Sequence, residues 1–142
     1  MAEGAGDGTD ADPPVDDVGR VLVALHPDVE HDGNRVMAWF EPQPEHRGNP
    51  GWLHGGMAAT VLDHVCARAG AAAIGSRVVT GTLDLRYPQA VALDGGPYRV
   101  VAEAAEPRGR TVRVTGAIVD GDGRPMVEAK AMFVARPAAL GG

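Results

Sequence analysis

Residues 49–75 read NPGWLHGGMAATVLDHVCARAGAAAIG, and this stretch decides the fold. It opens with a turn at Asn49, and residues 56–73 then contain no proline and consist mostly of good helix formers. Apolar side chains occupy nearly every side of this segment, so we expect a helix that is buried on most of its surface. Asp63 and His64 stand in its middle. A carboxylate on so apolar a helix needs a bonding partner or a chemical role.

The start of this helix has its own signature, His54-Gly55-Gly56. The first backbone N–H groups of a helix have no acceptor within it, and they carry partial positive charge. Glycines allow a ligand to approach these groups closely. The arrangement favours an anion site, or a polariser for a carbonyl oxygen that becomes negative during a reaction. A flexible loop leading into the helix explains the two glycines equally well, but the acid seven residues later favours a function.

The spacing between Gly56 and Asp63 constrains where chemistry can occur. Seven residues make nearly two helical turns, so the two residues face the same way but lie about 10 Å apart along the axis. Asp63 therefore cannot reach a carbonyl held at the start of its own helix. Two antiparallel helices related by a two-fold axis would bring the start of one near the middle of the other. The spacing thus predicts a dimer with paired sites at its interface.

Charge is unevenly distributed along the chain of 142 residues, whose formal net charge is −6. Residues 1–17 hold six acidic side chains and no Lys or Arg, so the remainder carries 13 acids against 13 bases and is close to neutral. The absence of a basic run and the scarcity of aromatic residues argue against nucleic-acid binding. We expect residues 1–17 to form a disordered acidic tail.

The single cysteine, Cys66, excludes a disulfide framework within one chain and fits a reducing compartment. The N-terminus lacks the basic and apolar regions of a signal peptide, and no apolar run reaches membrane-spanning length. These features favour a cytoplasmic protein without membrane contact.

Strand patterns surround the helix in a single domain, which we place at residues 18–137 with a short tail at 138–142. Residues 19–25 fit a strand or a short helix. The clearer strands are expected at 35–41, 77–87, 98–106, 110–120 and 125–134. Most of their connections are short turns, which implies antiparallel pairing. The fold class is therefore α+β, with an antiparallel sheet curled around one long central helix.

At this point the chain resembles a known family. A sheet of five or six antiparallel strands around a central helix resembles the hotdog fold. The segment Trp52-Leu53-His54-Gly55-Gly56 followed by Asp63 resembles the HGG-x6-D signature of PaaI-type acyl-CoA thioesterases. Thr80-x6-Tyr87 is similar to a strand of that family in which a Ser or Thr near the active site precedes a tyrosine by seven residues. The resemblance extends over residues 35–135.

The resemblance implies hydrolysis of an acyl-CoA thioester by a dimer or a dimer of dimers, without a metal or cofactor. Gly56, with Gly55, would furnish the N–H groups that polarise the thioester carbonyl. Asp63, supplied by the other chain, would act as nucleophile or activate water. Thr80 would orient Asp63 or the water, and His54 would shape the helix start and contact the substrate.

Two further substrate-binding positions follow less directly. Many family members hold an asparagine six residues before the histidine, where this chain has Gly48; either Asn49 substitutes for it or the role is absent. Arg108 and Arg110 flank a turn and are candidates for contacts with CoA phosphates, although a solvated hairpin end explains them too. We expect the loop residue His46 to be solvated.

Other interpretations of the helix residues stay open. Asp63 would be structural if it formed an ion pair with Arg68 or Arg86 inside a dimer interface. A His64–Asp63 dyad is disfavoured because neighbouring residues on a helix point about 100° apart. His64 and Cys66 diverge and lack a third ligand, so no metal site is expected. At the level of function, the alternatives are a non-catalytic acyl-CoA-binding or scaffold protein and, last, a dehydratase or hydratase.

Overall fold

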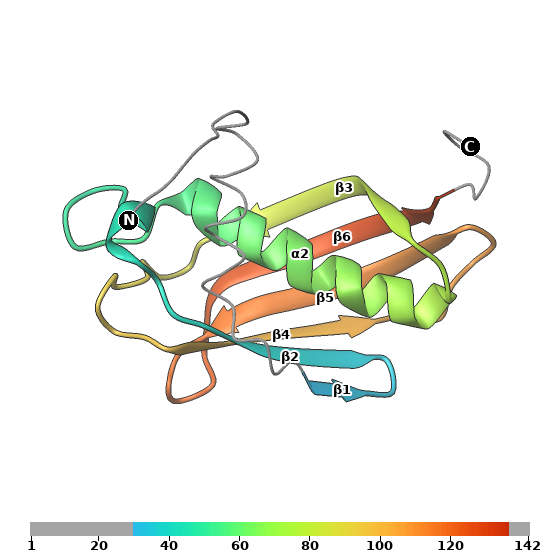
Figure 1. Ribbon diagram of the computed structural model, residues 1–142, viewed down its shortest axis with the longest axis horizontal. Coiled ribbons are helices and arrows are strands. Elements are labelled where there is room, and N and C mark those ends of the chain that lie inside the picture. Colours follow the sequence, from blue (N-terminus) through green and yellow to red (C-terminus); the bar gives the residue numbers. More distant parts are fainter. Residues whose placement is uncertain (1–29, 137–142) are drawn as a thin grey trace, which may run out of the picture.

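The computed structural model describes residues 30–136, so the expectations for the acidic tail, for residues 19–25 and for the tail at 138–142 lie outside the described residues. Residues 30–136 form two layers (Figure 1). One is a six-stranded antiparallel sheet, and the other is a single long helix, α2 (Gly55–Ile74), which lies across one face of that sheet. Nothing in residues 30–136 is a helix long and apolar enough to cross a membrane.

The sheet has the strand order β1-β2-β4-β5-β6-β3, and every pair of neighbours is antiparallel. Its strands are β1 (Glu30–Asp32), β2 (Arg35–Phe40), β3 (Val78–Arg86), β4 (Tyr98–Ala104), β5 (Thr111–Val119) and β6 (Pro125–Ala135). The strand that follows α2 in sequence, β3, crosses to the far side of the sheet and forms one edge, while the short β1 forms the other.

The predicted α+β architecture is confirmed, and each of the five expected strands is present close to its predicted bounds. The sixth strand, β1, was not predicted, because residues 26–34 contain Pro27, Asp32 and Gly33, which are typical of a turn. Gly33, with a φ of 63°, provides the left-handed residue of a tight turn that pairs β1 with β2. The turn was thus recognised correctly, but the three-residue strand before it carries too little pattern to be detected.

The helix packs one face fully into the core, and most of its other residues are half-buried within this single chain. Its buried residues recur every three or four positions: Ala58, Val61, Leu62, Val65, Cys66, Ala69 and Gly70. This stripe packs on strands β2 to β6, whereas Arg68 and Ala72 on other sides are exposed.

The helix lies unusually close to the sheet at Gly116 of β5. A Cβ atom at that position would lie 2.5 Å from the Sγ of Cys66 and 3.5 Å from a methyl group of Leu62. Gly70 on the helix has a similar role, because a Cβ there would lie 3.2 Å from Val112. Glycine on both layers therefore sets how closely α2 approaches the core around Phe133.

His46 corrects the expectation that this loop histidine is solvated. It ends a short 3-10 helix, η2 (Pro44–His46), and its side chain is only 1% exposed. The ring stacks on Phe40 with centroids 6.1 Å apart, and its Nδ1 accepts the N–H of Gln43 at 3.0 Å. The His46 carbonyl also accepts the N–H of His54 at 2.8 Å. The histidine therefore anchors the loop that leads into α2.

We predict that Gly116→Ala destabilises the fold by about 1–3 kcal/mol, because the added methyl group must displace Cys66 or move the helix away from the sheet. Urea unfolding followed by circular dichroism would measure this. Gly121→Ala is the matched control, since no atom lies within 4 Å of a Cβ at that turn position. Equal stability of the two variants would contradict the close approach described here.

Candidate active site

The side chain of His54 caps α2. His54 is the extended residue immediately before the helix, and its Nδ1 accepts the N–H of Gly56 at 2.9 Å, while its carbonyl accepts the N–H of Met57. A Cβ on Gly56 would lie 3.0 Å from the imidazole ring, so glycine provides the room for this cap. The N–H of Gly56, which the sequence predicted to polarise the thioester carbonyl, therefore already donates to the His54 side chain.

The amide of Gly55 is the one left open at the helix start. Its N–H finds no acceptor among residues 30–136, and the residue is exposed. Its carbonyl accepts the hydroxyl of Tyr87 at 2.8 Å, and a Cβ at Gly55 would be in ordinary contact with the Tyr87 ring. Tyr87, quoted in the sequence motif but given no role there, thus ties the end of β3 to the helix start.

Asp63 has a bonding partner on β3. The Thr80 hydroxyl donates to its Oδ1 at 2.8 Å, and the aspartate is partly buried. The register of β3 against β6 shifts between Thr80 and Thr82, which marks a bulge at Gly81. Thr80 pairs with Phe133, a core residue, so the bulge aims Thr80 toward the helix. The predicted pairing of Thr80 with Asp63 is therefore present, while its catalytic purpose stays a prediction.

Both contacts lie between α2 and the strand that forms the free edge of the sheet. Gly55 and Asp63 are eight residues apart, or about 12 Å along the helix axis, so one chain does not bring the open amide to the carboxylate. Within the described residues neither Arg68 nor Arg86 forms an ion pair with Asp63. The ion-pair alternative thus gains no support from a single chain, although the hydrogen bond from Thr80 already gives Asp63 a bonding partner.

Two other ionisable groups of α2 are held uncharged. Burial and the positive charge of Arg68 lower the pKa of His64, with Asp63 opposing them. Burial raises the pKa of the Cys66 thiol to about 12, so it stays protonated at neutral pH and is a poor nucleophile. Across residues 30–136 there is no group of three or more His, Cys, Asp or Glu side chains suited to hold a metal ion.

The loop before the helix explains the missing asparagine. A Cβ at Gly48 would lie 3.0 Å from the Cα of His54, because two backbone segments run together there. Asn49 is exposed, and its carbonyl accepts the N–H of Trp52 in a turn. Asn49 lines the same open hollow as Arg47 and Gly55, so it lies near the helix start, and its role in substrate binding stays a prediction.

Arg108 and Arg110 lie at the opposite end of the molecule from the open amide. They belong to the turn between β4 and β5, which is close to the C-terminal end of α2 in Figure 1. Arg110 donates to the carbonyl of Ala135 at 2.9 Å. One chain therefore does not bring these arginines to Gly55, and a contact with substrate would have to come from another copy.

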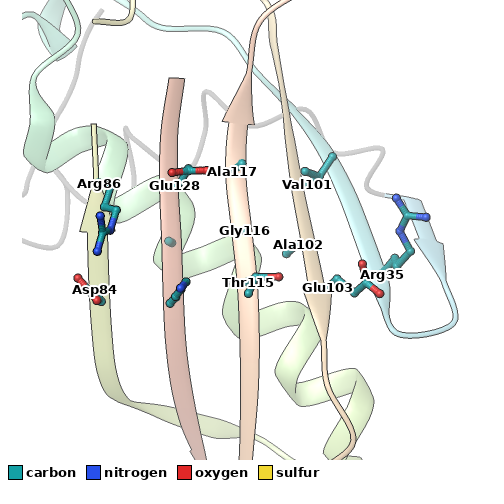
Figure 2. Close-up of a pocket in the computed structure, with 12 residues that line it drawn as sticks. Arg35, Asp84, Arg86, Val101, Ala102, Glu103, Thr115, Gly116, Ala117 and Glu128 are labelled. Atoms are coloured by element: carbon teal, nitrogen blue, oxygen red, sulfur yellow. The ribbon is translucent and has the colours of Figure 1, made fainter. Parts of the chain in front are cut away.

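A second hollow, of about 620 Å³, lies on the outer face of the sheet, with α2 on the other side (Figure 2). Charged residues of opposite sign, including Asp84, Arg86 and Glu103, surround small side chains at its centre. None of the predicted site residues lines it. Sequence reasoning did not find this hollow, because alternating charged residues on an outward strand face are also typical of a solvated surface.

Comparison with known proteins gives structural neighbours only. No family model and no curated protein matches the chain. A thioesterase superfamily protein of known structure is 29% identical with a TM-score of 0.68, over 75% of this chain and 54% of its own, so the present chain spans about half of it. Zebra fish thioesterase superfamily member 2 is 19% identical, with a TM-score of 0.73 over 82% of this chain and 85% of its own.

A hypothetical thioesterase protein from Streptococcus pneumoniae, whose structure contains coenzyme A, is 20% identical with a TM-score of 0.66 over 76% of this chain and 86% of its own. With the antiparallel sheet wrapped on one central helix, these neighbours establish that the chain has the hotdog fold. At the coarse level, its structural relatives are thioesterase-superfamily proteins.

We predict that His54→Ala destabilises the fold by about 1 kcal/mol, because the N–H of Gly56 loses its acceptor. His54→Asn should recover most of that loss, since asparagine is a good helix cap. Urea unfolding of the three proteins would measure both effects. If alanine and asparagine were equally destabilising, the role of His54 would not be capping.

Proposed function

We propose that this protein is an acyl-CoA thioesterase of the PaaI type that works in the cytoplasm as a homodimer or a dimer of dimers. The observation that carries the proposal is the placement of two groups along one seam. The carboxylate of Asp63 accepts the hydroxyl of Thr80 on β3, and the carbonyl of Gly55, the residue whose N–H is open, accepts the hydroxyl of Tyr87 directly after β3. The coenzyme A bound to the Streptococcus pneumoniae neighbour supports a CoA ester as the substrate.

The exposed edge of the sheet supports the dimer. β3 is nine residues long and has a strand neighbour, β6, on only one side among the described residues. A long open edge is a template for pairing with another chain. Antiparallel pairing of two β3 strands about a two-fold axis would place the two α2 helices side by side in opposite directions. The open amide of Gly55 would then face Asp63 of the partner subunit.

In such a site the thioester carbonyl accepts the N–H of Gly55 at the positive end of α2. In one route Asp63 of the partner subunit takes a proton from water as the water oxygen bonds to the carbonyl carbon. The carbonyl oxygen becomes negative and is stabilised by the amide. The C–S bond then breaks, and CoA leaves as a thiolate that takes up a proton.

In the second route the carboxylate itself attacks the carbonyl carbon and expels CoA, and water then opens the resulting anhydride. Both routes yield a free acid and CoA without a metal or redox cofactor. They are distinguished by a single turnover in isotopically labelled water, because only the anhydride route can transfer the label to Asp63.

Asp63→Asn should lower kcat for acyl-CoA hydrolysis by at least about 100-fold, because an amide neither attacks nor accepts the proton. Release of free CoA, followed with a thiol reagent over a panel of acyl-CoAs, would measure this. Asp84→Asn, on the outer face of the same region, is the matched control and should retain activity. Full activity of Asp63→Asn would refute the mechanism, and binding without turnover by the unaltered protein would favour a non-catalytic acyl-CoA binder.

A mixing experiment tests whether the site lies between two chains. Gly55→Pro removes the open N–H at a helix position that tolerates proline, and we expect it and Asp63→Asn each to be inactive alone. Unfolding and refolding them together should restore roughly a quarter of the original activity, because half of the dimers are mixed and each mixed dimer contains one intact site. A site within a single chain would give no recovery.

A further inference from the structure

An apolar hollow of about 230 Å³ lies directly beside the open amide. Its floor consists of the buried side chains of Ala58, Val91 and Val127, contributed by α2, the loop between β3 and β4, and β6. Gly55 and Tyr87 form one part of its wall. Gln89 and Tyr87 are its polar residues and no charged side chain lines it, so the hollow is suited to an uncharged, mainly hydrocarbon group.

Gly55 also lines an adjoining, wider hollow, together with Arg47, Asn49 and Trp52, and the two hollows share Leu53 and Ala90. The two hollows differ in character. The wide one is open and contains a cation, two polar groups and an exposed aromatic ring, whereas the small one has an apolar floor. A thioester carbonyl bound at Gly55 therefore lies next to both a mainly apolar space and a more polar surface.

We propose that the small hollow receives the acyl group and selects uncharged chains of up to about eight carbons, with the CoA portion leaving over the polar hollow. This inference rests on the proposed thioesterase function. At about 30 Å³ for each water-sized group, the hollow holds roughly seven or eight such groups beyond the carbonyl. Longer chains protrude into solvent and gain nothing further, and a terminal carboxylate is excluded by the apolar floor.

Ala90 offers a way to close the hollow without disturbing the core. It is exposed, so a larger side chain there does not overpack the fold, in contrast to the buried Ala58. Ala90 also lines the wide hollow, but an effect on the CoA portion is common to all esters and cancels in a ratio of kcat/KM values. Ala90→Phe should occupy much of the space beside Tyr87. Ala105→Phe is the matched control, because Ala105 is also exposed but follows β4 at the other end of the sheet.

The experiment compares kcat/KM for acetyl-, hexanoyl-, octanoyl-, palmitoyl- and succinyl-CoA. In the unaltered protein kcat/KM should rise from acetyl to octanoyl, gain less than about twofold from octanoyl to palmitoyl, and be lowest for succinyl. Complete burial of one methylene group changes binding by about fourfold, and this hollow is partly open. Ala90→Phe should therefore lower the hexanoyl-to-acetyl ratio of kcat/KM by at least about 10-fold, while Ala105→Phe leaves that ratio unchanged.

Two failures are distinguishable. If the unaltered protein hydrolyses acyl-CoAs but Ala90→Phe leaves the chain-length profile unchanged, the acyl pocket is assigned wrongly and the thioesterase proposal stands. If none of the five esters is hydrolysed, the proposed function fails and the pocket assignment fails with it.

Discussion

Two side-chain hydrogen bonds, from Thr80 to Asp63 and from Tyr87 to Gly55, hold the edge strand β3 against α2. The rest of the candidate site depends on them. They bring a carboxylate and a helix start to the same seam although the two are separated along the helix. The strand order leaves the outer edge of β3 without a strand neighbour among residues 30–136. A third constraint, the bulge at Gly81, makes this possible, because without it Thr80 would point to the outer face.

At the start of α2, the helix cap and the proposed ligand site both use backbone N–H groups of the first turn, and only a few such groups are available. A helix offers several N–H groups at its first turn that have no acceptor inside the helix. Here the His54 ring accepts the N–H of Gly56, and the His54 carbonyl accepts the N–H of Met57. The N–H of Gly55 is therefore the one without an acceptor among residues 30–136. The side chain of His54, immediately before the helix, therefore determines which backbone N–H stays available to a ligand. His46, buried under the same loop, fixes the backbone from which that side chain projects.

Much of the fold was predictable from the sequence because its signals are local. Alternating strands, glycine turns and the long proline-free segment each leave a pattern in neighbouring residues, and the pairing of Thr80 with Asp63 followed from a resemblance in spacing. What was missed depends on packing between distant segments. The burial of His46 requires Phe40, and the engagement of the Gly56 amide depends on a side-chain rotamer of His54.

The bond between Tyr87 and Gly55 also has a consequence for alkaline tolerance. A phenol must keep its proton to donate to a carbonyl, and its removal would place a negative charge against the Gly55 oxygen. Burial raises the pKa of Tyr87 above its ordinary value of 10.0. The hydrogen bond from Tyr87 to the Gly55 carbonyl is therefore insensitive to pH throughout the neutral and mildly basic range, and it is lost only in strong base.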